Sequence, residues 1–134
     1  MNKNLVKALQ DEFPWIPKLN PLYSLNYPMS IDCADGWFTL IHDLCLKIDA
    51  ALPDKYKESF TVDQIKEKMA GLRFYTNFAT EEISKIIREA ESLSFTICEE
   101  CGASGSMHRQ RGWYRTLCVK CATRLEADLV EVTV

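Results

Sequence analysis

The chain has 134 residues, of which 47% are hydrophobic and 26% are charged, and its formal net charge is −3. This size and composition are typical of one globular domain, and they exclude a disordered tail, a fibrous protein or two ordinary domains. The weak net charge gives no strong attraction to nucleic acid or to an acidic lipid surface. No apolar run approaches the ~18 residues that span a bilayer. The opening residues have the pattern of an amphipathic helix and not of a signal peptide, so we expect a cytoplasmic protein without a membrane partner.

Residues 1–34 are expected to form a helix followed by a proline-rich arm. A helix over about 3–12 would place Leu5, Val6 and Leu9 on one face. The prolines that follow prevent a continuous helix and favour an extended or turn-rich path. The arm is too aromatic for a flexible linker, so we expect it to wrap against the core. Its prolines and apolar residues are Pro14, Trp15, Pro17, Leu19, Pro21, Leu22, Tyr23, Leu25, Tyr27 and Pro28.

The most regular helical pattern follows Asp35, which has the character of an N-cap. Apolar residues recur at three- and four-residue steps and stop before Pro53, as at the end of a helix. The predicted buried face carries Trp37, Leu40, Ile41, Leu44, Cys45, Ile48 and Leu52.

The stretch 61–71 admits two interpretations. The motif TVDQ at residues 61–64 matches a capping box, and apolar residues at helical spacing continue toward Gly71. We therefore expect a helix, with a hairpin arm as the alternative.

Residues 72–75, Leu-Arg-Phe-Tyr, predict a short strand, and Thr80 opens a further helix. The predicted buried face of the helix after Thr80 carries Ile83, Ile86, Ile87, Ala90 and Leu93.

Two further elements are expected near the C-terminal end: a strand over 112–117 and a terminal helix from Ala122 to about Leu129.

Two C-x-x-C pairs predict a metal site in residues 97–134. Cys98 and Cys101 form the first pair, Cys118 and Cys121 form the second, and sixteen residues separate the pairs. This spacing is typical of one zinc ion held by four thiolates in a zinc-ribbon or treble-clef arrangement. Four thiolates fill the coordination shell, so the predicted zinc is structural and not catalytic. His108 is an alternative ligand that we expect to be a loop residue instead.

A redox dithiol and an iron–sulfur cluster are the alternatives to zinc at these cysteines. A redox C-x-x-C pair normally lies on a thioredoxin-like βαβ unit, whose pattern is missing from this sequence. Iron would use the same four thiolates, so only metal analysis separates it from zinc.

A basic stretch lies between and just after the two cysteine pairs. From Gly102 to Arg124 there are four arginines, one lysine and no acid, so the stretch carries +5. Arginine suits phosphate and aromatic rings stack on bases, so nucleic-acid binding is one interpretation. A protein-binding surface is favoured over it, and neutralisation of the negatively charged zinc tetrathiolate is the third alternative. The candidate binding residues are Arg109, Arg111, Trp113, Tyr114, Arg115, Lys120 and Arg124.

Cys33, His42 and Asp43 suggest a nucleophile arrangement only weakly. Cys33 precedes the helix that carries His42, and we expect a small packed residue and a surface histidine instead. No phosphate-binding loop, dinucleotide fingerprint or H-E-x-x-H motif is present. We therefore do not expect an enzyme and name no catalytic residue.

An ordered set of motifs resembles a family of small zinc-ribbon-like proteins of bacteriophages and prophages. The likeness covers about residues 31–123, and where such sequences usually read Lys-Phe-Gly-Gly-Leu-Arg-Phe this chain has Met69 and Ala70. The resemblance implies a phage-type accessory protein in the cytoplasm of a bacterial host, and it supplies no catalytic residues. The motifs are Asp35-Gly-Trp37, Leu40-Ile41, Gln64–Lys68, Gly71–Tyr75, Ala90-Glu91, Ser94, Cys98–Gly102, Gly112-Trp113 and Thr116–Ala122.

Taken together, the patterns predict one α+β domain over 1–134. Its regions are the N-terminal helix and arm (1–34), a helical core with a short strand (35–96) and a zinc module (97–134) that Trp113 and Leu117 dock onto the core. The expected function is non-enzymatic binding of a host macromolecule, most favourably a protein, with inhibition as a consequence. A nucleic-acid-binding regulator that uses residues 109–124 is the alternative, and no oligomeric state is predicted.

Overall fold

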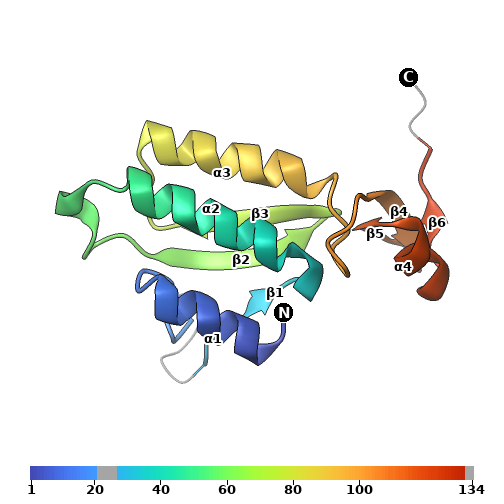
Figure 1. Cartoon of the computed structure of the whole chain (residues 1–134), viewed down its shortest axis with the longest axis horizontal. Coiled ribbons are helices and arrows are strands. Elements are labelled where there is room, and N and C mark those ends of the chain that lie inside the picture. Colours follow the sequence, from blue (N-terminus) through green and yellow to red (C-terminus); the bar gives the residue numbers. More distant parts are fainter. Residues whose placement is uncertain (21–26, 132–134) are drawn as a thin grey trace.

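The computed structural model describes residues 1–20 and 27–131 and confirms the predicted α+β class. The described chain forms a larger body, up to residue 97, and a smaller C-terminal module, residues 98–131, at one end of it (Figure 1). The helices are α1 (Lys3–Glu12), α2 (Phe38–Ala51), α3 (Glu81–Ser94) and α4 (Val119–Arg124), with short 3-10 helices η1 (Asp35–Trp37) and η2 (Asp54–Tyr56). The strands are β1 (Ile31–Asp32), β2 (Val62–Lys68), β3 (Gly71–Thr76), β4 (Ser106–Gln110), β5 (Trp113–Leu117) and β6 (Asp128–Leu129).

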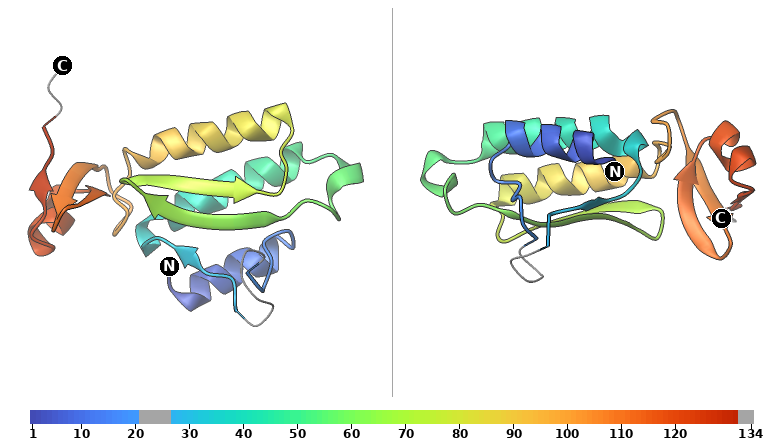
Figure 2. Two further views of the ribbon diagram at one scale, coloured as in Figure 1. Left: turned by 180° about the vertical axis from the view of Figure 1, so that it is seen from behind. Right: turned by 90° about the horizontal axis from the view of Figure 1, so that it is seen from below.

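The body has two layers, a three-stranded sheet and the helices α1, α2 and α3 on one of its faces (Figure 2). The strand order is β1-β2-β3, with β1 parallel and β3 antiparallel to β2. The core lies between the layers, and burial of each large side chain stabilises the fold by about 1.5–3 kcal/mol. Its largest fully buried side chains are Leu9, Phe13, Ile16, Ile31, Trp37, Ile41, Leu44, Ile48, Phe60, Ile65, Leu72 and Ile83.

The helices predicted from residues 3 and 37 are confirmed, but Asp35 does not cap the second one. Asp35 begins η1, and its carboxylate instead accepts hydrogen bonds from the backbone and side chain of Asn2. Asn2 in turn caps α1 by accepting a hydrogen bond from the Leu5 amide at 3.0 Å. The start of α1 is thereby joined to the turn that precedes α2.

The helix predicted over 61–71 is wrong, and the alternative hairpin is correct. Val62 and Ile65 are spaced as on a helix, but a bulge between Val62 and Gln64 shifts the register and lets both side chains face the core. Ile65 then lies between Ile31 of β1 and Phe74 of β3, where β-branched side chains pack well.

The turn of this hairpin uses two residues with left-handed backbone. Met69 has φ 52° and Ala70 has φ 73°, which is the mirror-image turn that suits the twist of a two-residue hairpin. The Ala70 amide donates to Glu67 at 2.8 Å, and its carbonyl accepts from the Thr116 hydroxyl at 2.8 Å. These bonds hold a conformation that glycine adopts more readily than alanine.

The strand over 72–75 and the helix after Thr80 are confirmed, but Leu93 is exposed and Ser94 is buried. Ser94 accepts a hydrogen bond from the Leu72 amide at 2.9 Å, and Glu91 accepts one from the Phe74 amide at 3.0 Å. Polar side chains of α3 therefore satisfy the outer edge of β3, which orients this part of the helix.

The proline-rich arm lies partly on the core, as expected. Trp15 is buried, and its indole nitrogen donates to Asp49 on α2 at 3.0 Å. Leu19 and Tyr27, by contrast, are exposed. The remaining arm residues Pro21, Leu22, Tyr23 and Leu25 lie outside the described residues.

The C-terminal module is a sheet of order β5-β4-β6 with α4 beside it. The strand predicted over 112–117 is confirmed, but the helix predicted over 122–129 is wrong because α4 starts earlier and ends at Arg124. Glu126, with φ 56°, stops the helix, and the amides of Glu126 and Ala127 bond back to Thr123 and Ala122 as in a Schellman motif. The chain then enters β6 and pairs with β4.

The prediction that Trp113 docks the module onto the body is wrong, because that side chain is 75% exposed. Leu117 is fully buried, but it packs in the separate small core of the module with Cys98, Cys121 and Ala122. The contacts with the body come from η1 and the β2–β3 turn instead. The Ala34 amide, just before η1, donates to Glu99 at 2.9 Å, and the Thr116 hydroxyl donates to the Ala70 carbonyl at 2.8 Å. Within the body, the Trp37 indole donates to the Ile97 carbonyl at 2.9 Å and so holds the residue that leads into the module.

Gly36 provides the closest approach between the two parts. A Cβ atom there would lie 2.4 Å from the Glu99 carbonyl oxygen, 2.5 Å from the Cys98 carbonyl oxygen and 2.6 Å from the Cys101 nitrogen. All three are backbone atoms, so a side chain at position 36 requires η1 and the first cysteine pair to move apart.

Replacement Gly36→Ala is expected to lower the free energy of unfolding by about 3 kcal/mol or more, because the new methyl group overlaps backbone. Urea denaturation of the metal-loaded protein measures this. Gly112→Ala is the matched control, because Gly112 has φ 84° and open space around its Cβ position, so it should cost only about 1 kcal/mol. Equal losses in the two variants would contradict the close packing.

Candidate metal centre

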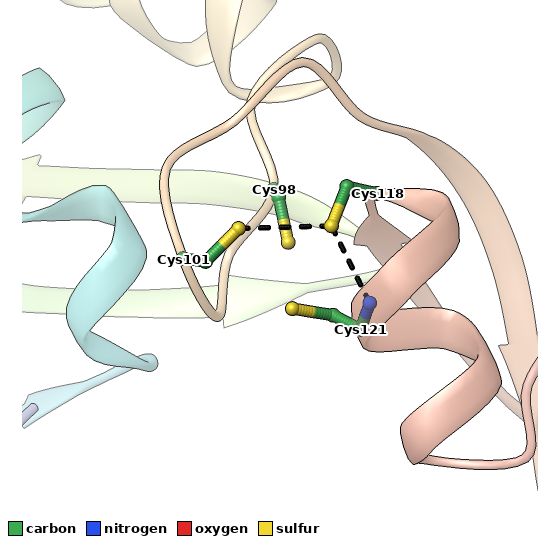
Figure 3. A group of neighbouring side chains, drawn as sticks. All are labelled: Cys98, Cys101, Cys118 and Cys121. Atoms are coloured by element: carbon green, nitrogen blue, oxygen red, sulfur yellow. Dashed lines mark hydrogen bonds between the residues drawn. The ribbon is translucent and has the colours of Figure 1, made fainter.

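The two cysteine pairs meet between the body and α4. Figure 3 shows the sulfur atoms of Cys98, Cys101, Cys118 and Cys121 directed toward one another from a loop and from the start of α4. The four sulfur atoms all lie within 4.8 Å of one another, and those of Cys101 and Cys118 are 3.6 Å apart. Cys98 and Cys121 are buried, whereas Cys101 is exposed.

The first pair lies in a tight turn, which we call the knuckle, residues 98–102. The Gly102 amide donates to the Cys98 carbonyl at 2.9 Å, and the Cys98 amide donates to the Ala103 carbonyl at 2.7 Å. Gly102 has φ 83°, which glycine adopts without steric cost, and its Cβ position is 3.1 Å from the Gly36 carbonyl oxygen. The knuckle thus has the tight backbone that brings both of its sulfurs to one side.

The second pair lies where β5 meets α4. Cys118 is the N-cap of α4, and its sulfur accepts a hydrogen bond from the Cys121 amide at 3.4 Å. That backbone hydrogen bond lowers the pKa of the Cys118 thiol to about 7. The cap therefore favours the thiolate, which is the form that binds a metal ion.

The distances fit a tetrahedral metal ion. Metal–sulfur bonds of ~2.3 Å in a tetrahedron separate the sulfur atoms by ~3.8 Å. The observed separation of 3.6 Å between Cys101 and Cys118, and the upper limit of 4.8 Å for the group, require only small movements. These four cysteines can hold one metal ion, and four thiolates would complete its coordination.

His108 lies outside this group. It is buried in β4 and not in a loop, and its Nδ1 is 2.8 Å from the Ser106 carbonyl oxygen. The expectation that cysteine thiols and not His108 make up the site agrees with the geometry.

Two acids of the knuckle, Glu99 and Glu100, pair with two arginines of the basic stretch. Arg115 lies 3.2 Å from Glu99 and 2.8 Å from Glu100, and Arg124 lies 3.6 Å from Glu100. Glu99 is 4% exposed, and burial raises the pKa of its carboxyl group. Arg115 is therefore an internal partner of the module, whereas Arg124 is 61% exposed and pairs with Glu100 at the surface.

The other predicted binding residues lie on the surface of the module. Arg111 occupies the β4–β5 turn with φ 49°, beside the exposed Trp113. The Arg109 guanidinium lies 5.8 Å from the centre of the Tyr114 ring, and register places both residues in one cross-strand pair. Lys120 is exposed on α4. Sequence reasoning missed Val119 and Leu129, which are 78% and 61% exposed, because isolated apolar residues carry no pattern.

The nucleophile arrangement imagined for Cys33 and His42 does not form. Burial raises the pKa of the Cys33 thiol to about 12, which keeps it protonated. His42 pairs with Glu12 at 2.9 Å and stacks on Phe38. Cys33 is packed in the core of the body, as expected, whereas His42, expected at the surface, is half-buried.

Comparison with known proteins adds no assignment, since no protein family, curated protein or solved structure matches the chain. Among the described residues, no helix combines the length and the apolar character needed to cross a membrane.

Cys118→Ser is expected to lower metal affinity about 100-fold or more, because it removes one of the four thiolate ligands, whereas the serine hydroxyl can still cap α4. Metal content per chain after dialysis, measured by mass spectrometry, reports the loss. Cys45→Ala is the control, since Cys45 is buried in the body and should leave the metal content unchanged. A Cys118 variant that keeps full metal content would contradict the site.

Metal removal is expected to unfold the module and leave α1, α2 and α3 intact, because the core of the body contains none of the four ligands. Circular dichroism should then retain most of the helical signal after chelation, while trypsin cleaves at Arg109 and Arg111. Adding the metal back should restore protection. Complete loss of helical signal would show that the body depends on the metal.

Proposed function

We propose that the metal is one structural zinc ion and that this chain is a non-enzymatic binding protein. Four thiolates in a closed shell suit zinc and leave no position for a catalytic water. The order of knuckle, hairpin and helix with the second ligand pair supports a treble-clef-like module. Purification followed by elemental analysis separates zinc from iron, which would also colour the protein.

The binding surface that we propose is the hairpin surface: Arg109, Arg111, Trp113 and Tyr114 at the outer part of β4–β5. The exposure of 75% of Trp113 is the observation that carries this proposal. Tryptophan and arginine dominate protein-binding energy when a partner covers them, and an indole left in water contributes little to the fold. A metal-stiffened hairpin holds these side chains ready without ordering costs at binding.

The charges favour a protein partner over nucleic acid. Glu99 and Glu100 neutralise Arg115 and Arg124, so Arg109, Arg111 and Lys120 remain as cations without a carboxylate partner among the described residues. Val119 and Leu129 add exposed apolar surface to the same module. Binding that relies on three cations and exposed apolar groups fits a protein better than a phosphate backbone.

The resemblance to phage and prophage proteins supports the setting of this proposal. A phage-type accessory protein acts in the bacterial cytoplasm, and its partner would be a host protein whose surface the hairpin covers and blocks. The second candidate function is binding of nucleic acid as a regulator. The observation that favours it is the position of the Arg109 guanidinium above the ring of Tyr114, because both groups can also stack on a base.

Zinc-loaded protein is expected to retain one specific partner from bacterial lysate, and Trp113→Ala should weaken that complex by about 2 kcal/mol or more. Tyr75→Ala is the matched control, since Tyr75 is an exposed aromatic residue on the body. Immobilised protein and mass spectrometry identify the partner, and titration with the purified partner measures affinity. Equal effects of the two variants would reject the hairpin surface.

Fluorescence anisotropy with labelled DNA and RNA tests the second candidate. The protein-binding proposal predicts no tight binding at low salt. Tight binding whose logarithm falls steeply with the logarithm of salt concentration, and whose slope flattens in Arg109→Ala and Arg111→Ala, would replace it with nucleic-acid recognition. Arg115→Ala should instead destabilise the module, because Arg115 neutralises buried Glu99.

A further inference from the structure

A groove runs between α2 and α3 on the outer side of the helical layer, the side that Figure 1 faces. Its volume is about 620 Å³. Cys101 and Gly102 of the knuckle lie at one end of it. Its apolar lining includes Leu40 and Leu44 of α2, Ile86, Ala90 and Leu93 of α3, and Ile97, with Leu5 of α1 and Phe38 at the start of α2 beside them.

The apolar lining is not fully covered by the fold. Leu93 is 49% exposed although it follows the apolar spacing of α3, and Ile86 is half-buried. Leu93 faces the groove because Ser94 takes the inward position, where it holds the Leu72 amide. Exposed apolar side chains that gather along a groove are typical of a binding surface.

The charged side chains that line the groove are mostly acidic, while Lys85 and Arg88 lie in an adjoining hollow on α3. Asp35, Asp43 and Glu89 line it with a single base, Lys47, so the lining carries three negative charges and one positive charge. Glu89 has only a long contact of 4.0 Å with Lys85, and both side chains are well exposed. Such a rim attracts cationic groups.

We propose that this groove, which we call the α2–α3 groove, binds an amphipathic helix of a partner protein, with apolar anchors on one face and lysine or arginine beside them. Two neighbouring helices offer a third helix the ridges and grooves that it needs for packing. The stretch from Leu40 to Lys47 spans about 10 Å, which matches two turns of such a helix. The groove goes beyond the proposed function, since its lining lies mainly on the body and none of its lining residues belongs to the hairpin surface.

The probe for this proposal is a fluorescein-labelled peptide of about fourteen residues, long enough to form a helix, with leucines at helical spacing and lysines elsewhere. The same peptide with glutamate for lysine tests the charge. Anisotropy of the zinc-loaded full chain should show saturable binding of the lysine peptide and binding about tenfold weaker or more for the glutamate peptide. Chemical-shift changes in a nitrogen–proton correlation spectrum should gather on α2 and α3.

Leu93→Asp should lower the affinity for the lysine peptide about tenfold or more, because it places a charge in the apolar lining. Leu46→Asp is the matched control, since Leu46 is 45% exposed on α2 and lies outside the groove. The double variant Asp43→Lys, Glu89→Lys should lower the affinity for the lysine peptide and raise the affinity for the glutamate peptide. The double variant Glu58→Lys, Glu131→Lys makes the same change of net charge elsewhere and should leave both affinities unchanged.

Circular dichroism of each variant checks the fold, and because Leu93 is exposed we expect Leu93→Asp to fold. No binding of the lysine peptide, equal binding of both peptides, or equal effects of Leu93→Asp and Leu46→Asp would each overturn the proposal. Trp113→Ala should leave this binding unchanged, so the hairpin surface and the α2–α3 groove can fail independently.

Discussion

The contact between Gly36 and the knuckle joins the two parts of this molecule. The missing side chain lets η1 approach the carbonyl groups of Cys98 and Glu99 and the amide of Cys101. The same short segment begins α2 with the fully buried Trp37, whose indole nitrogen bonds to the Ile97 carbonyl just before the knuckle. The metal ligands are thus built directly onto the end of the hydrophobic core. The position of the module and the end of the α2–α3 groove both depend on this contact.

Ion pairs divide the cations of the module into those that its own acids neutralise and those that have no carboxylate partner among the described residues. The basic stretch contains five cations by sequence, but the two acids between Cys98 and Cys101 pair with two of them. Glu99 faces inward to both the Ala34 amide and Arg115, so it connects body and module as well as neutralising charge. Of the cations that remain, Arg109 and Arg111 lie on the same β4–β5 hairpin as the exposed Trp113, and this combination supports the proposal of a protein-binding surface.

The strongest predictions came from patterns whose physical cause is local. Helix α2 follows from apolar residues at three- and four-residue steps, and the cysteine group follows from ligand spacing. The helix expected over 61–71 failed because a β-bulge gives Val62 and Ile65 the same inward direction that a helix would give them. The prediction of a terminal helix over 122–129 was wrong because Glu126 adopts a left-handed backbone conformation, which its residue type does not predict. The prediction that Leu93 is buried was wrong because Ser94 faces inward to bind the Leu72 amide at the edge of β3.

Local patterns in the chain predict the α+β class, two long helices, the proline-rich arm and the identity of four possible metal ligands, because propensity, periodicity and ligand chemistry act over a few residues. The folded molecule was needed to show which arginines are free, which apolar residues remain exposed and where the module docks. Those outcomes depend on pairs such as Glu99 with Arg115, or Thr116 with Ala70, whose partners lie far apart in the chain. Charge and exposure are properties of the folded surroundings, so a residue's role as a binding or a structural group is settled only when its long-range neighbours are in place.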